Sequence, residues 1–197
     1  MGHGYTKIPD GILPRTFYIK VTDEHPEGIV VNEFGQKANV RKMNMSKRKQ
    51  ETYYELKFKY KGVTRHVSMH YLVFCTFHHI PKKGNHIDHI DGSHFNNRPS
   101  NLREVTPAIN HRDSGFCKLS QNRGIDPVQF PAKVLLAYYE ILAEFLETHT
   151  YYAYRHLTRD DLREFIRQAM EKVDGRKYQL CDPHDLSDRE ISRHCEF

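Results

Sequence analysis

The chain has 197 residues, a formal net charge of +5 and no tryptophan, and its length suits one or two small domains, each with a hydrophobic core. No apolar stretch is long enough to span a bilayer, and the opening residues MGHGYTKIPDG lack an apolar signal core, so we expect no membrane partner. The scattered cysteines Cys75, Cys117, Cys181 and Cys195 argue against a cysteine zinc site and a disulfide framework. We therefore expect a soluble protein in a reducing compartment, the cytoplasm.

The charge is distributed unevenly along the chain. Residues 37–83 contain 12 Lys/Arg against 2 Asp/Glu, whereas residues 132–197 contain 10 against 13. A concentrated basic surface is what neutralisation of nucleic-acid phosphates requires. The alternative is a solubilising surface whose lysines face water.

Residues 1–83 are predicted to be rich in antiparallel strands. Residues 16–22 and 28–32 are candidate strands because they are rich in β-branched and aromatic residues. Residues 43–50, MNMSKRKQ, are expected to form a basic loop.

Two further strands are predicted at residues 51–60 and 63–68, joined at Lys61-Gly62. In the first of them, apolar side chains alternate with charged ones, which predicts one buried face and one exposed charged face that includes Glu55. Residues 69–79 follow with apolar side chains at helical spacing, which predicts a buried helix in which His70 has a packing role.

Residues 84–112 form the segment around which the rest of the chain is organised. Residues 85–90 read as a strand, Asp91-Gly92 as a turn, residues 93–100 as a polar loop and residues 102–105 as a returning strand. Thr106-Pro107 is a helix-start signal. Asn110 would then lie one turn into that helix, where its side chain can be carried over the strands.

The C-terminal part is predicted to be helical. Residues 117–131 are expected to be a polar linker, and residues 132–148 have the apolar stripe of an amphipathic helix. A second helix is predicted to begin near Thr158, with Asp161 completing a capping pattern, and to end before Asp174-Gly175. The pair predicts an αα-hairpin, whose acidic balance favours docking or self-association over phosphate binding.

The order and spacing of Asp88-His89, Asn101 and Asn110 resemble the HNH endonuclease motif, the ββα-metal fold, and more closely its phage and intron homing-endonuclease branch. The resemblance spans roughly residues 28–112 and implies a central ββα-metal motif (84–116). Together with the elements predicted above, it gives an α+β protein with N-terminal antiparallel strands (residues 1–83), a linker (117–131) and a C-terminal helical region (132–197). It also implies His89 as general base, Asn101 as the residue that ties the loop between the strands, and Asp88 and Asn110 as metal ligands.

The side-chain chemistry of these residues suits phosphodiester hydrolysis. A histidine that titrates near neutral pH can take a proton from water. Asp88 and Asn110 offer oxygen ligands, which favour one divalent ion, Mg²⁺ or Mn²⁺, over Zn²⁺. Because neighbouring residues on a strand point to opposite faces, cooperation between Asp88 and His89 requires a twist or bulge, which is inferred from the resemblance alone.

 The function that the resemblance implies is hydrolysis of double-stranded DNA to 5′-phosphate and 3′-hydroxyl ends. Because the chain has one HNH motif, a monomer would nick one strand of the DNA, and a double-strand break would need a homodimer or two sequential events. The favoured context is a homing enzyme, acting in the host cytoplasm if phage-encoded. The alternatives are a restriction- or toxin-type HNH nuclease and a DNA-binding protein with a decayed active site.

The predicted DNA contacts are basic residues from the loop, the strands and the motif, each of which could equally be a solvated surface charge. They are Lys47, Arg48, Lys49, Lys57, Lys59, Arg65, Arg98, Arg103 and Arg112.

Overall fold

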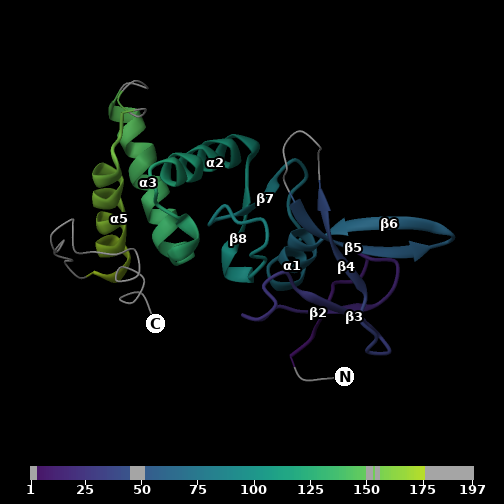
Figure 1. The fold of residues 1–197 in the computed structure, drawn as a ribbon. Helices are drawn as coiled ribbons and strands as arrows, with labels where there is room; N and C mark the ends of the chain where they lie inside the picture. Colours follow the sequence, from purple (N-terminus) through teal and green to yellow (C-terminus); the bar gives the residue numbers. More distant parts are fainter. Residues whose placement is uncertain (1–3, 45–51, 150–152, 154–155, 176–197) are drawn as a thin grey trace. The chain divides into compact units, whose positions relative to one another are not determined.

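The computed structural model describes residues 4–44, 52–149, 153 and 156–175 (Figure 1). These residues divide into two compact units. Unit 1 consists of Met1–His89 and Ser93–Pro107, and unit 2 consists of Ile90–Gly92 and Ala108–Phe197. The α+β class predicted from the sequence is confirmed, because antiparallel strands and helices are both present.

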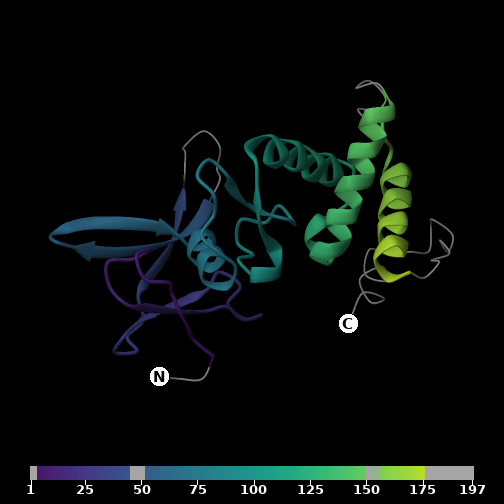
Figure 2. The ribbon, with the colours of Figure 1, turned by 180° about the vertical axis from the view of Figure 1, so that it is seen from behind.

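Unit 1 contains all the described strands, which form three antiparallel sheets. The first sheet has the order β1-β2-β3 and the second has the order β4-β5-β6, while β7 pairs with β8. The strands are β1 (Thr6–Lys7), β2 (Phe17–Lys20), β3 (Ile29–Asn32), β4 (Asn39–Asn44), β5 (Thr52–Tyr60), β6 (Val63–Ser68), β7 (His86–His89) and β8 (Leu102–Val105). Strands β5 and β6 form a hairpin that projects beyond the rest of unit 1 (Figures 1 and 2).

The core of unit 1 lies around helix α1 (Met69–Phe77). Met69 and Leu72 of this helix are fully buried, together with Ile19 and Val30 from the first sheet and Leu56 from β5. The predicted helix at residues 69–79 is therefore confirmed, and the reason is its apolar spacing. Side chains from these two sheets, from helix α1 and from Leu102 of β8 form a single hydrophobic core.

Strand β4 was not predicted. Its sequence, NVRKMN, is polar and basic, so it has neither of the periodic patterns that identify a strand. It nevertheless pairs with β5 in a register that runs from Asn39↔Lys57 to Asn44↔Thr52. Pairing with a long neighbouring strand, rather than local preference, is what makes these residues extended. The remainder of the predicted basic loop lies outside the described residues.

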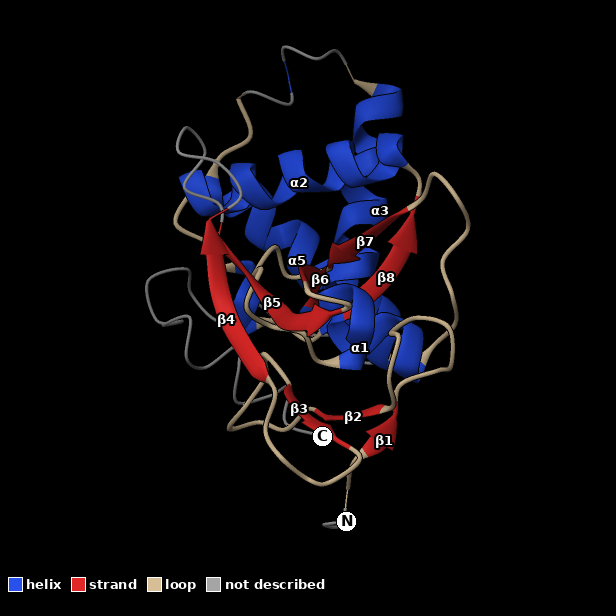
Figure 3. Cartoon of the chain, turned by 90° about the vertical axis from the view of Figure 1, so that its right-hand side faces the viewer, coloured by secondary structure: helices blue, strands red, loops and turns tan. Residues whose placement is uncertain are grey.

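In unit 2, all the regular structure that is described is helical (Figure 3). Its helices are α2 (Pro107–Asn122), whose first residue belongs to unit 1, α3 (Ala132–Thr148) and α5 (Arg159–Asp174), with short 3₁₀ turns at Pro127–Gln129 here and at Pro99–Asn101 in unit 1. The predicted hairpin is confirmed, since α3 and α5 pack against each other and share a core that includes Leu142 and Leu162.

The ends of the helices follow their local sequence signals. Thr158 and Asp161 form the reciprocal capping box predicted for α5, and Gly175 ends this helix in the left-handed conformation with φ 69°. Helix α2, however, continues to Asn122, so the segment that connects it to α3 is shorter than the predicted linker at residues 117–131. The C-terminal part of the predicted helical region, residues 176–197, lies outside the described residues.

The cysteines and the helices bear on the expectation of a soluble protein without disulfides. Cys75 and Cys117 are buried, and neither forms a disulfide with another described residue, while Cys181 and Cys195 lie outside the described residues. Among the described helices, none combines the length and the apolar character needed to cross a membrane.

Candidate active site

The pairing of β7 with β8 places the predicted site residues. Their register sets Asp88 opposite Arg103 and His89 opposite Leu102. Because side chains alternate along a strand, Asp88 and His89 leave β7 on opposite faces. His89 is buried at 5% exposure, and Leu102 opposite it belongs to the unit 1 core.

His89 is held by the side-chain amide of Asn97, for which the sequence predicted no role at the histidine. Its Nε2 lies 2.8 Å from Oδ1 of Asn97, which is 1% exposed. Asn97 in turn donates from Nδ2 to the backbone carbonyl of Glu27 at 3.1 Å, and its own N–H donates to the carbonyl of Pro26 at 2.9 Å. The ring of His89 is therefore attached, through one residue, to the backbone before β3.

Asn101 makes a hydrogen bond within the loop that it was expected to tie. It is buried, and its Nδ2 donates to the carbonyl of Asn96 at 2.8 Å. This hydrogen bond closes the loop between β7 and β8 on itself. The signal for Asn97 in the sequence was the pair Asn96-Asn97, but a pair of asparagines in a loop is also typical of turn chemistry.

Three aromatic side chains surround His89 within unit 1. The ring centroids of His70 and His94 lie 5.4 and 5.7 Å from that of His89, and that of Tyr53 lies 6.4 Å away. Tyr53 stacks on His94 at 4.2 Å, and its hydroxyl lies 3.2 Å from Nε2 of His94. The site therefore contains two histidines besides the predicted base, and His94 had no assigned role in the sequence.

The charge state of His70 follows from this environment. Burial, together with a smaller contribution from the positive charge that His89 and His94 can acquire, lowers the pKa of His70 to about 3. His70 is accordingly neutral near pH 7. This agrees with a packing role, although the ring packs against the candidate base itself.

Asp88 is paired with a residue that was predicted to contact DNA. Nε and Nη2 of Arg103 lie 3.0 and 2.7 Å from the same oxygen, Oδ2 of Asp88. The side chains of Asp88 and Arg103 are 13% and 19% exposed, so the pair is largely shielded from water. Charge-assisted hydrogen bonds of this kind orient a carboxylate strongly.

Residues 67–112 match a family model described as HNH endonuclease. This segment belongs to the HNH endonuclease family. The match contains all four motif residues, Asp88, His89, Asn101 and Asn110, and begins near the start of α1.

The chain is similar to a structure described as DNA binding and cleavage by the HNH homing endonuclease I-HmuI, with 23% identity and a TM-score of 0.40. The similarity covers 61% of this chain and spans 59% of the length of the other. No curated protein matches the chain.

The fourth residue of the HNH segment, Asn110, is on α2 and belongs to unit 2. Its pairing with Asp88 as a metal ligand stays a prediction. Within the described residues there is no cluster of three or more His, Cys, Asp or Glu side chains suited to a metal ion. The predicted ligand pair is of another kind, one carboxylate and one amide, and both offer the hard oxygen donors that suit Mg²⁺ or Mn²⁺.

The predicted DNA contacts of the β5–β6 hairpin lie on two faces. Lys57 is opposite His66 and Lys59 is opposite Thr64, whereas Arg65 is opposite Phe58. Directly paired residues share a face, so Lys57 and Lys59 lie on the face of Tyr53, and Arg65 lies on the other. The Tyr53 face leads along β5 to the rings around His89.

Glu55 lies on the same face as Lys57, but it is buried, contrary to the prediction from the sequence. The alternating pattern placed it among exposed charges, but it is 1% exposed and its Oε1 is 2.8 Å from both Nε of Arg41 and Nδ1 of His66. Burial raises the pKa of the Glu55 carboxyl, yet the hydrogen bonds from Arg41 and His66 outweigh burial and hold the pKa below its ordinary value. The Glu55 carboxylate therefore holds the side chains of Arg41 and His66 in place.

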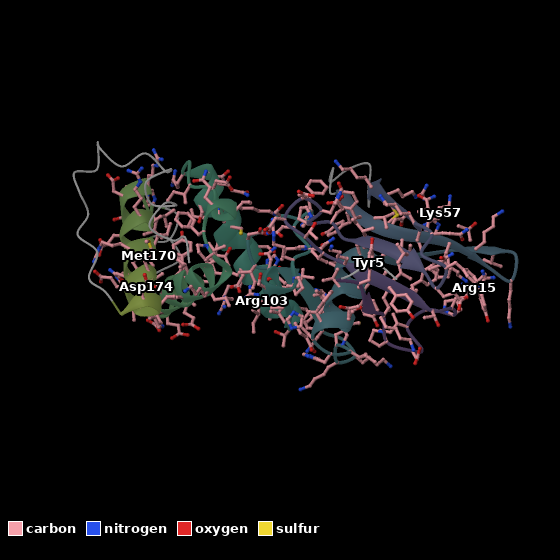
Figure 4. The ribbon with its side chains drawn as sticks, turned by 90° about the horizontal axis from the view of Figure 1, so that it is seen from below. Tyr5, Arg15, Lys57, Arg103, Met170 and Asp174 are labelled. Atoms are coloured by element: carbon pink, nitrogen blue, oxygen red, sulfur yellow. The ribbon has the colours of Figure 1, made fainter. Side chains whose placement is uncertain are left out.

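The remaining predicted DNA contacts have protein partners or are not described. Arg98 donates to the carboxylate of Asp23 at 3.0 Å, and Arg112 donates to that of Asp113 at 2.7 Å. Arg103 lies well apart from the hairpin that carries Lys57 (Figure 4). Three of the predicted contacts lie outside the described residues, namely Lys47, Arg48 and Lys49.

Proposed function

We propose that the chain is a DNA endonuclease of the HNH type that hydrolyses phosphodiester bonds to 5′-phosphate and 3′-hydroxyl ends. The observation that carries the proposal is the position of His89, which lies in the HNH segment and is held by a buried hydrogen bond to Asn97. A buried imidazole that is held in one orientation by a hydrogen bond suits the role of a general base.

In the proposed reaction, His89 takes a proton from water while the water oxygen forms a bond to phosphorus. The bond between phosphorus and the 3′ oxygen then breaks, and that oxygen leaves with a proton from solvent. Asn101 holds the loop between β7 and β8 through the carbonyl of Asn96. Asp88 and Asn110 would hold one divalent ion, Mg²⁺ or Mn²⁺, which when bound supplies positive charge to the phosphate and the departing oxygen.

The proposed substrate is double-stranded DNA, which approaches along the Tyr53 face of the hairpin. Lys57 and Lys59 on this face form no ion pair among the described residues, so they are available to phosphates. Strand rise is about 3.3 Å per residue, which puts Lys59 roughly 20 Å along β5 from Tyr53. That span corresponds to about six base pairs of DNA at 3.4 Å each.

The proposed enzyme has one active site per chain. A monomer would nick one strand, and a homodimer or two sequential events would cut both. A homing role is the favoured context. A homing enzyme would recognise a long and tolerant site, which mapping of cleavage positions on cognate and random DNA would reveal.

The test is nicking of a supercoiled plasmid with Mg²⁺. The wild-type chain should produce open circles, and His89→Ala should lower the rate by about 10²- to 10⁴-fold, the usual contribution of a general base. His86→Ala is the matched control, because His86 is an exposed histidine on the same strand, and it should leave nicking unchanged. A chain that retards DNA and leaves it intact would instead be a DNA-binding protein.

A further inference from the structure

The tautomer of His89 follows from three backbone and side-chain groups in unit 1. The carbonyl of Glu27 can only accept a hydrogen bond, so the group of Asn97 that faces it at 3.1 Å must be the amide NH₂. The other end of the amide, Oδ1, therefore faces His89 Nε2 at 2.8 Å. Since Oδ1 is also only an acceptor, Nε2 must carry the proton, and the lone pair of the neutral ring is on Nδ1.

We propose that Asn97 is a positioning residue that keeps His89 in the Nε2-protonated tautomer and so makes Nδ1 the nitrogen that takes the proton from water. The proposal rests on the proposed function, because the choice of nitrogen affects the rate only if His89 is the base. It assigns the role of orienting the ring to Asn97 and leaves Asn101 the role of closing the loop.

Burial makes this assignment strong. Asn97 and His89 are 1% and 5% exposed, so water cannot readily replace either partner. A buried N–H without an acceptor costs about 1–3 kcal/mol. Rotation of the amide to offer its NH₂ to the ring would set Oδ1 against the carbonyl oxygen of Glu27, so the hydrogen bond at 3.1 Å from Nδ2 to that carbonyl holds the amide in this orientation.

Two substitutions separate the two hydrogen bonds of the Asn97 side chain. Asn97→Leu and Asn97→Asp both remove the donor to the Glu27 carbonyl, but only the aspartate keeps an acceptor for Nε2. If Asn97 had only a structural role, through its bond to the Glu27 carbonyl, the two variants should therefore be impaired equally. If Asn97 fixes the tautomer of His89, that effect should be lost in Asn97→Leu and kept in Asn97→Asp.

The experiment is ¹⁵N NMR of the full chain with labelled histidines, recorded at alkaline pH, where the ring of His89 is neutral. The signal of His89 among the 14 histidines is identified by its absence in His89→Gln. The expected wild-type spectrum shows Nε2 protonated and Nδ1 unprotonated. Asn97→Leu should lose this signature and Asn97→Asp should keep it.

The rate of plasmid nicking supplies the second measurement. Asn97→Leu should reduce the rate constant at saturating DNA by about fivefold to 150-fold, which is the 1–3 kcal/mol of an unsatisfied N–H converted at 1.4 kcal/mol per factor of ten. KM should stay the same, and Asn97→Asp should recover part of the rate. Asn101→Leu, a buried asparagine of the same loop, is the control and should leave the tautomer signature intact.

The outcomes distinguish this proposal from the proposed function. A wild-type spectrum with the proton on Nδ1 overturns the assignment to Asn97 whether or not the chain nicks DNA, and it needs no variant to fold. Identical spectra for the leucine and wild-type chains overturn it as well. If the spectrum is as expected and no DNA is cut, the proposed function fails, while the tautomer assignment stands.

Discussion

The loop between β7 and β8 and the hairpin of α3 and α5 bury different kinds of side chain. In and beside the loop, His89, Asn97 and Asn101 are buried polar groups, each with a hydrogen bond to a neighbour. The buried residues of α3 and α5 are apolar or aromatic, such as Leu142, Leu162 and Ile166. Buried polar groups hold particular atoms in place, whereas apolar burial supplies stability with little directional demand.

The largest effect is expected in the helical hairpin. Leu162→Ala removes a fully buried side chain and should destabilise unit 2 by about 2–5 kcal/mol, because it leaves a cavity among α3 and α5. Hydrogen exchange measured peptide by peptide should show faster exchange in α3 and α5. The control is Lys172→Ala, whose ion pair with Glu140 is exposed at both ends, so its loss should have little effect on stability.

A second prediction concerns the buried carboxylate of the basic sheet. Glu55→Gln keeps the shape of the side chain but replaces charge-assisted hydrogen bonds with neutral ones, so it should destabilise unit 1 by about 2 kcal/mol at pH 7. Glu33→Gln, at an exposed position, should have almost no effect. Urea unfolding of both variants measures the difference.

The effect of Glu55 should also depend on pH. Its pKa is lowered in the folded chain relative to 4.5, so its contribution to stability is complete above about pH 4.5 and is lost as the pH falls through the lower, folded value. Stability curves of the wild type and Glu55→Gln should therefore converge below pH 4.5. Curves that stay parallel down to pH 3 would contradict the assignment of the shift to Glu55.

A smaller effect is expected at the start of α5. Thr158→Ala removes the side chain that accepts from the Asp161 N–H, and should cost about 1 kcal/mol. Thr148, at the end of α3, is exposed and its hydroxyl donates to carbonyls of its own helix. Thr148→Ala should cost less, and thermal unfolding of the two variants would show whether the cap is the cause.

The smallest single effects are expected on the hairpin face. Lys57→Ala and Lys59→Ala should each weaken DNA binding a few-fold and reduce the salt dependence of log K by about one, as loss of a phosphate contact does. Arg65→Ala removes an equal charge from the opposite face and should change the slope less. Equal slopes for all three variants would show that the face of β5 does not determine the path of the DNA.

Local patterns in the sequence were enough for most elements. The helices at Met69–Phe77 and Ala132–Thr148, the capping box at Thr158 and the strands β7 and β8 all follow from periodicity and end signals. These features depend on residues a few positions apart. The order of Asp88, His89, Asn101 and Asn110 was likewise readable, because a motif is a local pattern.

Only the tertiary structure decided which side chains meet. Asn97 reaches Glu27 across 70 positions of sequence, Arg41 and His66 converge on Glu55, and Arg103 pairs with Asp88 across two strands. Strand β4, with no periodic pattern of its own, exists because β5 lies beside it. Residue type and spacing determine local structure and candidate chemistry, but a hydrogen bond forms only between groups that folding brings within about 3 Å of each other.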